Sequence, residues 1–132
     1  GIQENIALVD RAKDGCAIVH SDSEEGIQRL NQEAAKVIAN AGRVGIAITP
    51  EHAIQWLTTN PAKAMGILDQ TGTLEAGKMA DVVLWNGNPF SSYAQAEQVY
   101  VDGARLYDRR DRSRQPTSDF LLGQDAARGG VR

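Results

Sequence analysis

The stretch AIVHSDSEEG, residues 17–26, changes from apolar to acidic within a few positions. Residues 16–20 form a short apolar run, which is typical of a strand buried on both faces, as in parallel sheets covered by helices. The run leads directly into His20 and Asp22. Because side chains alternate along a strand, these two residues are predicted to lie on the same side of it.

A helix is predicted on each side of this strand. Ser23 can cap the helix that follows, because its hydroxyl can accept from the unpaired amides of the first turn. Apolar residues then recur at helical spacing over residues 24–41. Residues 4–14 carry a shorter helical pattern, which Gly15 ends. This order of helix, strand and helix is typical of a repeating β/α fold.

Two further helix starts are marked by proline. Thr49-Pro50 and Asn60-Pro61 are each typical of an N-cap residue followed by a proline in the first turn. Gly66 is predicted to end the second of these helices.

Extended segments dominate the sequence beyond these helices. Residues 81–85 (DVVLW) predict a strand, and residues 99–107 (VYVDGARLY) predict a hairpin. Its turn is placed at Asp102-Gly103, because this pair can adopt the left-handed geometry of two-residue hairpins. So few strands do not form a stable sheet alone, and we expect them to need further partners.

The composition is that of an ordinary globular protein. Of 132 residues, 42% are hydrophobic and 23% are charged, and the net charge is −3. Neither nucleic acid nor an anionic membrane surface is therefore predicted as a partner. No apolar run approaches the roughly 20 residues of a membrane span. Cys16 is the only cysteine, which excludes an internal disulfide and leaves the redox compartment undecided.

Several motifs occur in an order that resembles the C-terminal part of the amidohydrolase superfamily. In chain order they are HSD (20–22), RLNQEAAK (29–36), TTNPAKAMGI (58–67), GTLEAGKMADVVLW (72–85) and VYVDGARLYD (99–108). The chain is most similar to the imidazolonepropionase-like and prolidase-like metal-dependent hydrolases of that superfamily. The resemblance spans residues 4–108.

This resemblance implies an α/β fold in which the chain is the C-terminal fragment of a (β/α)8 barrel. Residues 16–22 would be the last barrel strand and residues 24–41 the last helix. With the helices that follow, they would make up a first part, residues 1–70. Residues 71–108 would contribute a few antiparallel strands to a small composite β-sandwich, and residues 109–132 would form a flexible tail.

The resemblance also implies roles for Asp22 and His20. Asp22 corresponds to the family's aspartate at the C-terminal end of the last strand, where the active sites of such barrels lie. That aspartate contacts a metal ion and moves a proton between the attacking water and the leaving group. The alternative is that Asp22 only helps to cap the following helix. His20 is the second candidate metal ligand, and its alternative is a hydrogen-bonded histidine packed inside the barrel.

The function implied is hydrolysis of C–N bonds in a small molecule, whether an amide, a cyclic amide or a dipeptide, by metal-activated water. Zinc or another divalent metal would serve the complete enzyme. A catalytic zinc takes about three protein ligands, and the sequence has only two histidines. We therefore expect this chain alone to be inactive, with the metal bound in the complete enzyme and not necessarily in this fragment.

The expected partners follow from the same shortage of strands and ligands. They are the missing N-terminal portion of the barrel or a companion chain, and self-association along exposed strand edges is a further expectation. The competing hypothesis is a non-catalytic α+β interaction or oligomerisation module derived from such a hydrolase.

Overall fold

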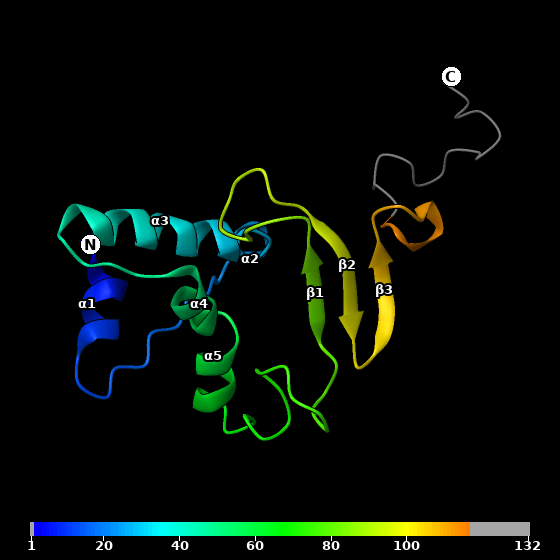
Figure 1. Ribbon diagram of the computed structural model, residues 1–132, viewed down its shortest axis with the longest axis horizontal. Coiled ribbons are helices and arrows are strands. Elements are labelled where there is room, and N and C mark those ends of the chain that lie inside the picture. The colour runs from blue at the N-terminus through cyan, green and yellow to red at the C-terminus, as the bar shows by residue number, and fades with distance from the viewer. Residues whose placement is uncertain (1, 117–132) are drawn as a thin grey trace.

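A computed structural model describes residues 2–116 of the chain. It is an α/β structure in which the α-helices lie on one side and a three-stranded sheet on the other, with one short 3-10 helix beside the last strand (Figure 1). None of the helices within the described range has the length and apolarity that a membrane crossing requires. The helices are α1 (Asn5–Arg11), α2 (Glu24–Ile27), α3 (Leu30–Arg43), α4 (Pro50–Ala53) and α5 (Thr59–Ala64), with 3-10 helices η1 (Ile54–Trp56) and η2 (Arg112–Arg114), and the strands are β1 (Val82–Trp85), β2 (Ala96–Val101) and β3 (Ala104–Asp108).

The strand predicted over residues 16–20 does not form. This segment belongs to no sheet in the described part of the chain, because no other described strand lies beside it to complete a ladder. The prediction that the segment is buried on both faces is also wrong, because its side chains alternate between buried and exposed. Ala17 and Val19 are buried, whereas Cys16 and His20 are exposed. The segment therefore has one face on the protein core and one face open, and the barrel arrangement is not seen.

The single helix predicted over residues 24–41 is divided into α2 and α3. Arg29, the residue before α3, has a φ of −125°, which interrupts the helical backbone. Gly26 lies in the middle of the four-residue α2, and glycine weakens a helix because it loses more backbone freedom than other residues. α3 continues beyond the predicted end to Arg43.

The two proline-marked helix starts have different outcomes. Thr49 is the N-cap of α4 as predicted, and its side chain accepts a hydrogen bond from the His52 amide at 3.2 Å. Asn60 is not the cap of α5. Thr58 precedes that helix and Asn60 is its second residue, so the Asn60 side chain is available for another contact.

The buried core lies between α1, α3, the segment 16–20 and the short helices α4 and η1. Trp56 is the one large side chain that is fully buried within the described residues. The remaining core residues are mostly alanines, which lets these elements approach one another closely. They are Ala7, Ala17, Val19, Ala34, Val37, Ala41, Ile46 and Ala53.

The sheet is antiparallel with the order β1-β2-β3. β1 matches the strand predicted at residues 81–85, and β2 and β3 form the predicted hairpin, although β2 begins earlier, at Ala96. Asp102 and Gly103 have φ values of 49° and 78°, which confirms the predicted turn geometry. No hydrophobic side chain of the three strands is buried.

The loop between α5 and β1 connects the helices to the sheet through polar contacts. Thr59 donates its hydroxyl hydrogen to the carbonyl of Gly72 at 3.0 Å. Further along, Asp81 accepts from the backbone amide of Asp102, in the hairpin turn, at 2.8 Å. The GTLEAGKMAD part of the motif at residues 72–85 is therefore a structural connection.

The division into residues 1–70, 71–108 and 109–132 stays a prediction. In the predicted tail, η2 lies within the described residues, and residues 117–132 lie outside them.

Candidate functional site

The structure brings the two predicted site residues together. His20 Nδ1 lies 3.6 Å from Asp22 Oδ1. Both side chains are open to solvent, with exposed fractions of 75% for His20 and 98% for Asp22. His20 ends the segment 16–20 and Asp22 follows it. Both lie on its open face, as the alternation of side chains requires.

The turn after this segment holds the Asp22 backbone without using the Asp22 carboxylate. Ser21 Oγ accepts from the Ser23 amide at 3.0 Å. Ser23 Oγ in turn accepts from the amide of Gly26 at 3.3 Å and caps α2. Ser23 therefore fills the capping position that was the alternative role of Asp22, and the Asp22 carboxylate points into solvent.

The segment 16–20 is fixed from its buried face by η1 and α5. The Val19 amide donates to the carbonyl of Trp56 at 3.2 Å. Asn60 Nδ2 donates to the carbonyl of Ala17 at 2.8 Å. With Ala17 and Val19 turned toward the core, the even-numbered side chains, including that of His20, face the opposite way.

The pair His20 and Asp22 fits part of a metal site. Two ligands bound to one tetrahedral zinc ion at about 2.1 Å are roughly 3.4 Å apart, which is close to the 3.6 Å between His20 Nδ1 and Asp22 Oδ1. Imidazole and carboxylate are both ligands that zinc accepts. However, residues 2–116 contain no group of three or more potential metal ligands. The pair can supply two ligands, and the others must come from elsewhere.

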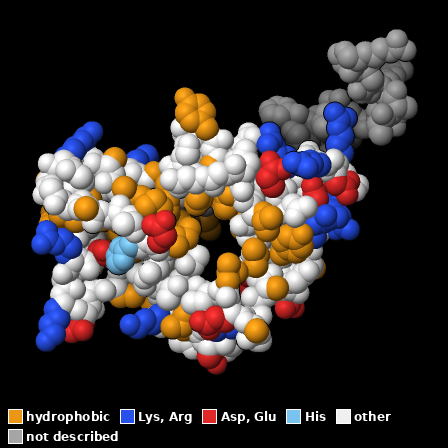
Figure 2. Space-filling view, viewed as in Figure 1, with side chains coloured by type: hydrophobic (Ala, Val, Ile, Leu, Met, Phe, Trp, Pro, Cys, Tyr) orange, Lys and Arg blue, Asp and Glu red, His pale blue; other side chains and the backbone are white. Residues whose placement is uncertain are grey.

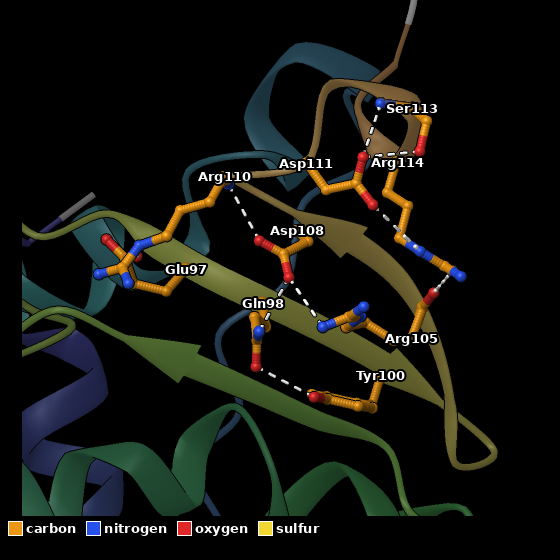
Figure 3. A network of polar contacts seen from close by, with 9 residues as sticks. All are labelled: Glu97, Gln98, Tyr100, Arg105, Asp108, Arg110, Asp111, Ser113 and Arg114. Atoms are coloured by element: carbon orange, nitrogen blue, oxygen red, sulfur yellow. Dashed lines mark hydrogen bonds and ion pairs between the residues drawn. The ribbon is translucent and has the colours of Figure 1, made fainter.

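A second acidic cluster joins β2, β3 and η2 (Figure 3). At its centre the buried Asp108 accepts from the amide of Arg110 and from Gln98 Nε2, both at 2.9 Å, and pairs with Arg105 at 2.9 Å. These contacts, first the Arg110 amide, hold the pKa of Asp108 below its ordinary value. Because its charge is fully paired, we assign this cluster a structural role.

A groove of about 660 Å³ lies between η1, α5 and the loop before β1. Its walls are mainly apolar, with Ile54, Pro61, Met65 and Leu74 among the lining residues. Neither His20 nor Asp22 lines it. Hydrophobic side chains are also exposed around the hollow in the middle of the face shown in Figure 2. Sequence reasoning missed this groove, because its walls come from separate segments that only the fold brings together.

Sequence reasoning also missed Asp10. Its carboxylate accepts from Trp56 Nε1 at 2.8 Å and lies 2.7 Å from His52 Nε2. These contacts tie α1 to α4 and η1. They also give His52 a structural partner. No local signal marks Asp10, because its partners are more than forty residues away.

Comparison with known proteins identifies one family. The family model described as "Amidohydrolase family" matches residues 7–108. An imidazolonepropionase of Shewanella oneidensis is 48% identical over 50 residues, which cover 38% of this chain and 12% of the relative. An imidazolonepropionase of Brucella suis is 49% identical over 47 residues, which cover 36% of this chain and 12% of the relative.

A solved structure is similar over most of the chain. It is the crystal structure of an amidohydrolase from Thermotoga maritima, with a TM-score of 0.68 and 31% sequence identity. The similarity covers 81% of this chain and 26% of that protein. The matched region is therefore a small part of each of these relatives.

Proposed function

The chain belongs to the amidohydrolase family of hydrolases, and on this premise we propose that it forms the C-terminal part of a metal-dependent enzyme that hydrolyses C–N bonds. The family generally uses divalent metals. Both relatives described above are named for an imidazolone, a ring that contains an amide C–N bond. Among the amide, cyclic amide and dipeptide substrates considered, this similarity favours a cyclic amide.

The observation that carries the proposal is the pairing of Asp22 with His20 on the open face of a fixed segment. The carboxylate of Asp22 is 98% exposed, and Ser23 already caps the following helix. Asp22 is therefore available for chemistry in a site that other parts of the enzyme would complete. The 3.6 Å between His20 Nδ1 and Asp22 Oδ1 supports His20 as a second ligand of the same ion.

In this proposal Asp22 handles the proton of the reaction. When bound, a divalent metal supplies the Lewis acidity that makes water a nucleophile at neutral pH. Asp22 accepts the proton that this water loses and delivers it to the nitrogen as the C–N bond breaks. His20 is a second donor on the same side of the segment, and zinc or another divalent ion is the metal that the two donors suit.

The proposal includes partners for this chain. The remaining ligands would come from the missing N-terminal portion of the barrel or from a companion chain, which would also lie beside the segment 16–20. The small share of each relative that matches supports this view. The comparisons give no support to the competing hypothesis of a non-catalytic module.

The test is Asp22→Asn in the complete polypeptide that carries this chain. Hydrolysis of a five-membered cyclic amide, hydantoin, is measured together with zinc content. We expect kcat to fall by about 10²–10⁴, the usual contribution of a general acid–base group. The matched control is Asp14→Asn, because Asp14 is also exposed and its φ of 62° is one that asparagine tolerates.

Turnover by the Asp22→Asn enzyme equal to that of the Asp14→Asn control would overturn the assignment of Asp22. A folded Asp22→Asn protein with normal zinc and lost turnover would support it. A dipeptide assayed beside hydantoin tests the substrate class. An enzyme that hydrolyses the dipeptide but not hydantoin would contradict the proposal that the substrate is a cyclic amide.

A further inference from the structure

The side-chain amide of Asn60 reaches across the fold to the segment that carries Asp22. Asn60 is the second residue of α5, and its Nδ2 donates to the carbonyl of Ala17 at 2.8 Å. The backbone carbonyl of Asn60 also faces Cys16, whose Sγ lies 3.9 Å away. Asn60 therefore contacts the beginning of the segment through both its side chain and its backbone.

A second contact fixes the same segment two residues further on. The Val19 amide donates to the carbonyl of Trp56, at the end of η1. The two hydrogen bonds engage Ala17 and Val19, the residues whose side chains are buried. Because neighbouring side chains point in opposite directions, fixing these two residues also fixes the direction of His20.

The contact with Asn60 takes the place of sheet pairing. A strand is usually held by ladder hydrogen bonds on both sides, and the segment 16–20 has no ladder within the described residues. Without the Asn60 side chain, the Ala17 carbonyl would lose this hydrogen bond. Trp56 and Asn60 belong to neighbouring elements, η1 and α5, and both contact the segment.

We propose that Asn60 is a positioning residue for the site: its amide, with the carbonyl of Trp56, holds residues 17–19 in the register that directs His20 and Asp22 to the open face. This inference rests on the proposed function for what Asp22 does, but the positioning itself can be measured without any reaction. This assigns a role in orienting the site to Asn60, the first residue of the sequence NPA at 60–62.

The chain contains a matched control for this inference. Asn31 is the second residue of α3, and its Nδ2 donates to a distant backbone carbonyl, that of Pro89, at 2.7 Å. Asn60 and Asn31 thus share residue type, helix position and type of bond. They differ only in the segment that they hold.

The experiment compares Asn60→Asp with Asn31→Asp in the full chain. Each change keeps the size of the side chain and removes the donor, and a carboxylate is tolerated in the first turn of a helix. Backbone amide exchange rates are measured by NMR in each variant and in the native chain. The change in rate at each amide is then divided by the change in rate at the slowest-exchanging sheet amides. We expect Val19 to exchange roughly tenfold faster in Asn60→Asp, the factor that one lost hydrogen bond gives.

Backbone order parameters show whether the loosening is confined to the segment that leads to the site. They should fall at residues 18–22 in Asn60→Asp and stay unchanged there in Asn31→Asp. Asn60→Ala removes the donor without adding charge, and the same result there excludes electrostatic repulsion as the cause. Equal normalised exchange of Val19 in the Asn60 and Asn31 variants, with unchanged order parameters, would overturn the inference.

The outcome is separable from that of the proposed function. Loosening of residues 18–22 in Asn60→Asp, together with full turnover in Asp22→Asn, would leave the positioning intact and remove the role of Asp22. Loss of turnover in Asp22→Asn, with no effect of Asn60→Asp on the exchange of Val19, would keep the role of Asp22 and remove the positioning role of Asn60.

Discussion

At the scale of single residues, Gly72 shows why the loop before β1 needs glycine. Its φ is +93°, and a Cβ added there would lie 2.6 Å from the Cβ of Ala62 in α5. Gly77, in the same loop, has a φ of +91° but no atom within 4 Å of an added Cβ. A comparison of the two glycines therefore separates two free-energy costs of an added side chain. One is the cost of a positive φ, and the other is the cost of steric contact with α5.

We expect Gly72→Ala to be more destabilising than Gly77→Ala. Both changes place a side chain at positive φ, which costs about 1–2 kcal/mol. Gly72→Ala must also displace Ala62, which adds about 1–3 kcal/mol in an overpacked site. Urea unfolding followed by tryptophan fluorescence measures both, and equal losses of unfolding free energy would contradict the close approach of the loop to α5.

Asp108 is a buried carboxylate whose charge is favoured by several contacts of the fold. The Arg110 amide, Gln98 and Arg105 favour its carboxylate, so its pKa in the folded protein is lowered. Folding therefore gains stability from Asp108 above the ordinary aspartate pKa of about 3.9. That contribution is lost as the pH falls below about 4, toward the lowered pKa.

Asp108→Asn should remove this pH dependence. We expect the variant to be less stable than the native chain near pH 7, and the difference in unfolding free energy to shrink as the pH falls below about 4. Glu75 also has a lowered pKa, but it does not interact with Asp108 and its effect cancels in the difference. The lowering of the Asp111 pKa is opposed by the charge of Asp108, so Asp108→Asn removes that opposition as well. Unfolding free energies measured between pH 7 and pH 3 test this, and a constant difference would contradict it.

At the scale of elements, the loop between α5 and β1 is organised around one ammonium group. Lys78 Nζ donates to the carbonyl of Leu68 at 2.7 Å and to Thr73 Oγ1 at 2.6 Å, and it pairs with Glu75 at 3.0 Å. Its side chain is only 13% exposed. A loop without regular hydrogen bonding can be held in one shape when a central donor satisfies its oxygen atoms.

Lys78→Met should loosen this loop and the attachment of β1. Methionine keeps the apolar length of the side chain, but the Leu68 carbonyl loses its charged donor, so we expect a loss of about 2 kcal/mol in unfolding free energy. Glu75→Gln is the control and should change the stability far less, because that carboxylate is mostly exposed. Similar losses in the two variants would show that the exposed ion pair, not the carbonyl contact, organises the loop.

At the scale of the whole molecule, the sheet is uncovered. Among the described strands the only buried side chain is that of Asp108, while Val83, Leu84 and Leu106 are exposed by 44%, 48% and 60%. Antiparallel sheets normally bury one face. The apolar groove beside α5 adds to this exposed surface. We therefore propose that another chain or further strands cover these surfaces.

The isolated chain should self-associate. Light scattering coupled to size exclusion, at about 100 μM, should give a mass above the 14.2 kDa of the monomer. Leu106→Lys should reduce association, because a lysine on an edge strand opposes strand pairing. Tyr93→Lys serves as the control, since Tyr93 is 90% exposed but lies outside the sheet. A monomer mass for the native chain would contradict the proposal.

Local signals in the sequence determined the short-range features of this protein. Ser23 and Thr49 cap their helices, and Asp102-Gly103 makes the hairpin turn, because each depends on the backbone preferences of a few adjacent residues. The side of the segment 16–20 on which each residue lies follows for the same reason, whereas the exposure of one of its two faces was not predicted. The ordered motifs also indicated the family to which the chain belongs.

Only the tertiary structure decided which distant groups meet. The bond from Asn60 to Ala17 joins residues 43 positions apart, and Asp10 reaches Trp56 over 46. The predicted strand at 16–20 failed to form because a ladder requires a neighbouring strand, and the described part of the chain places none there. Such contacts depend on how the whole backbone brings its segments together, and no preference of adjacent residues encodes that.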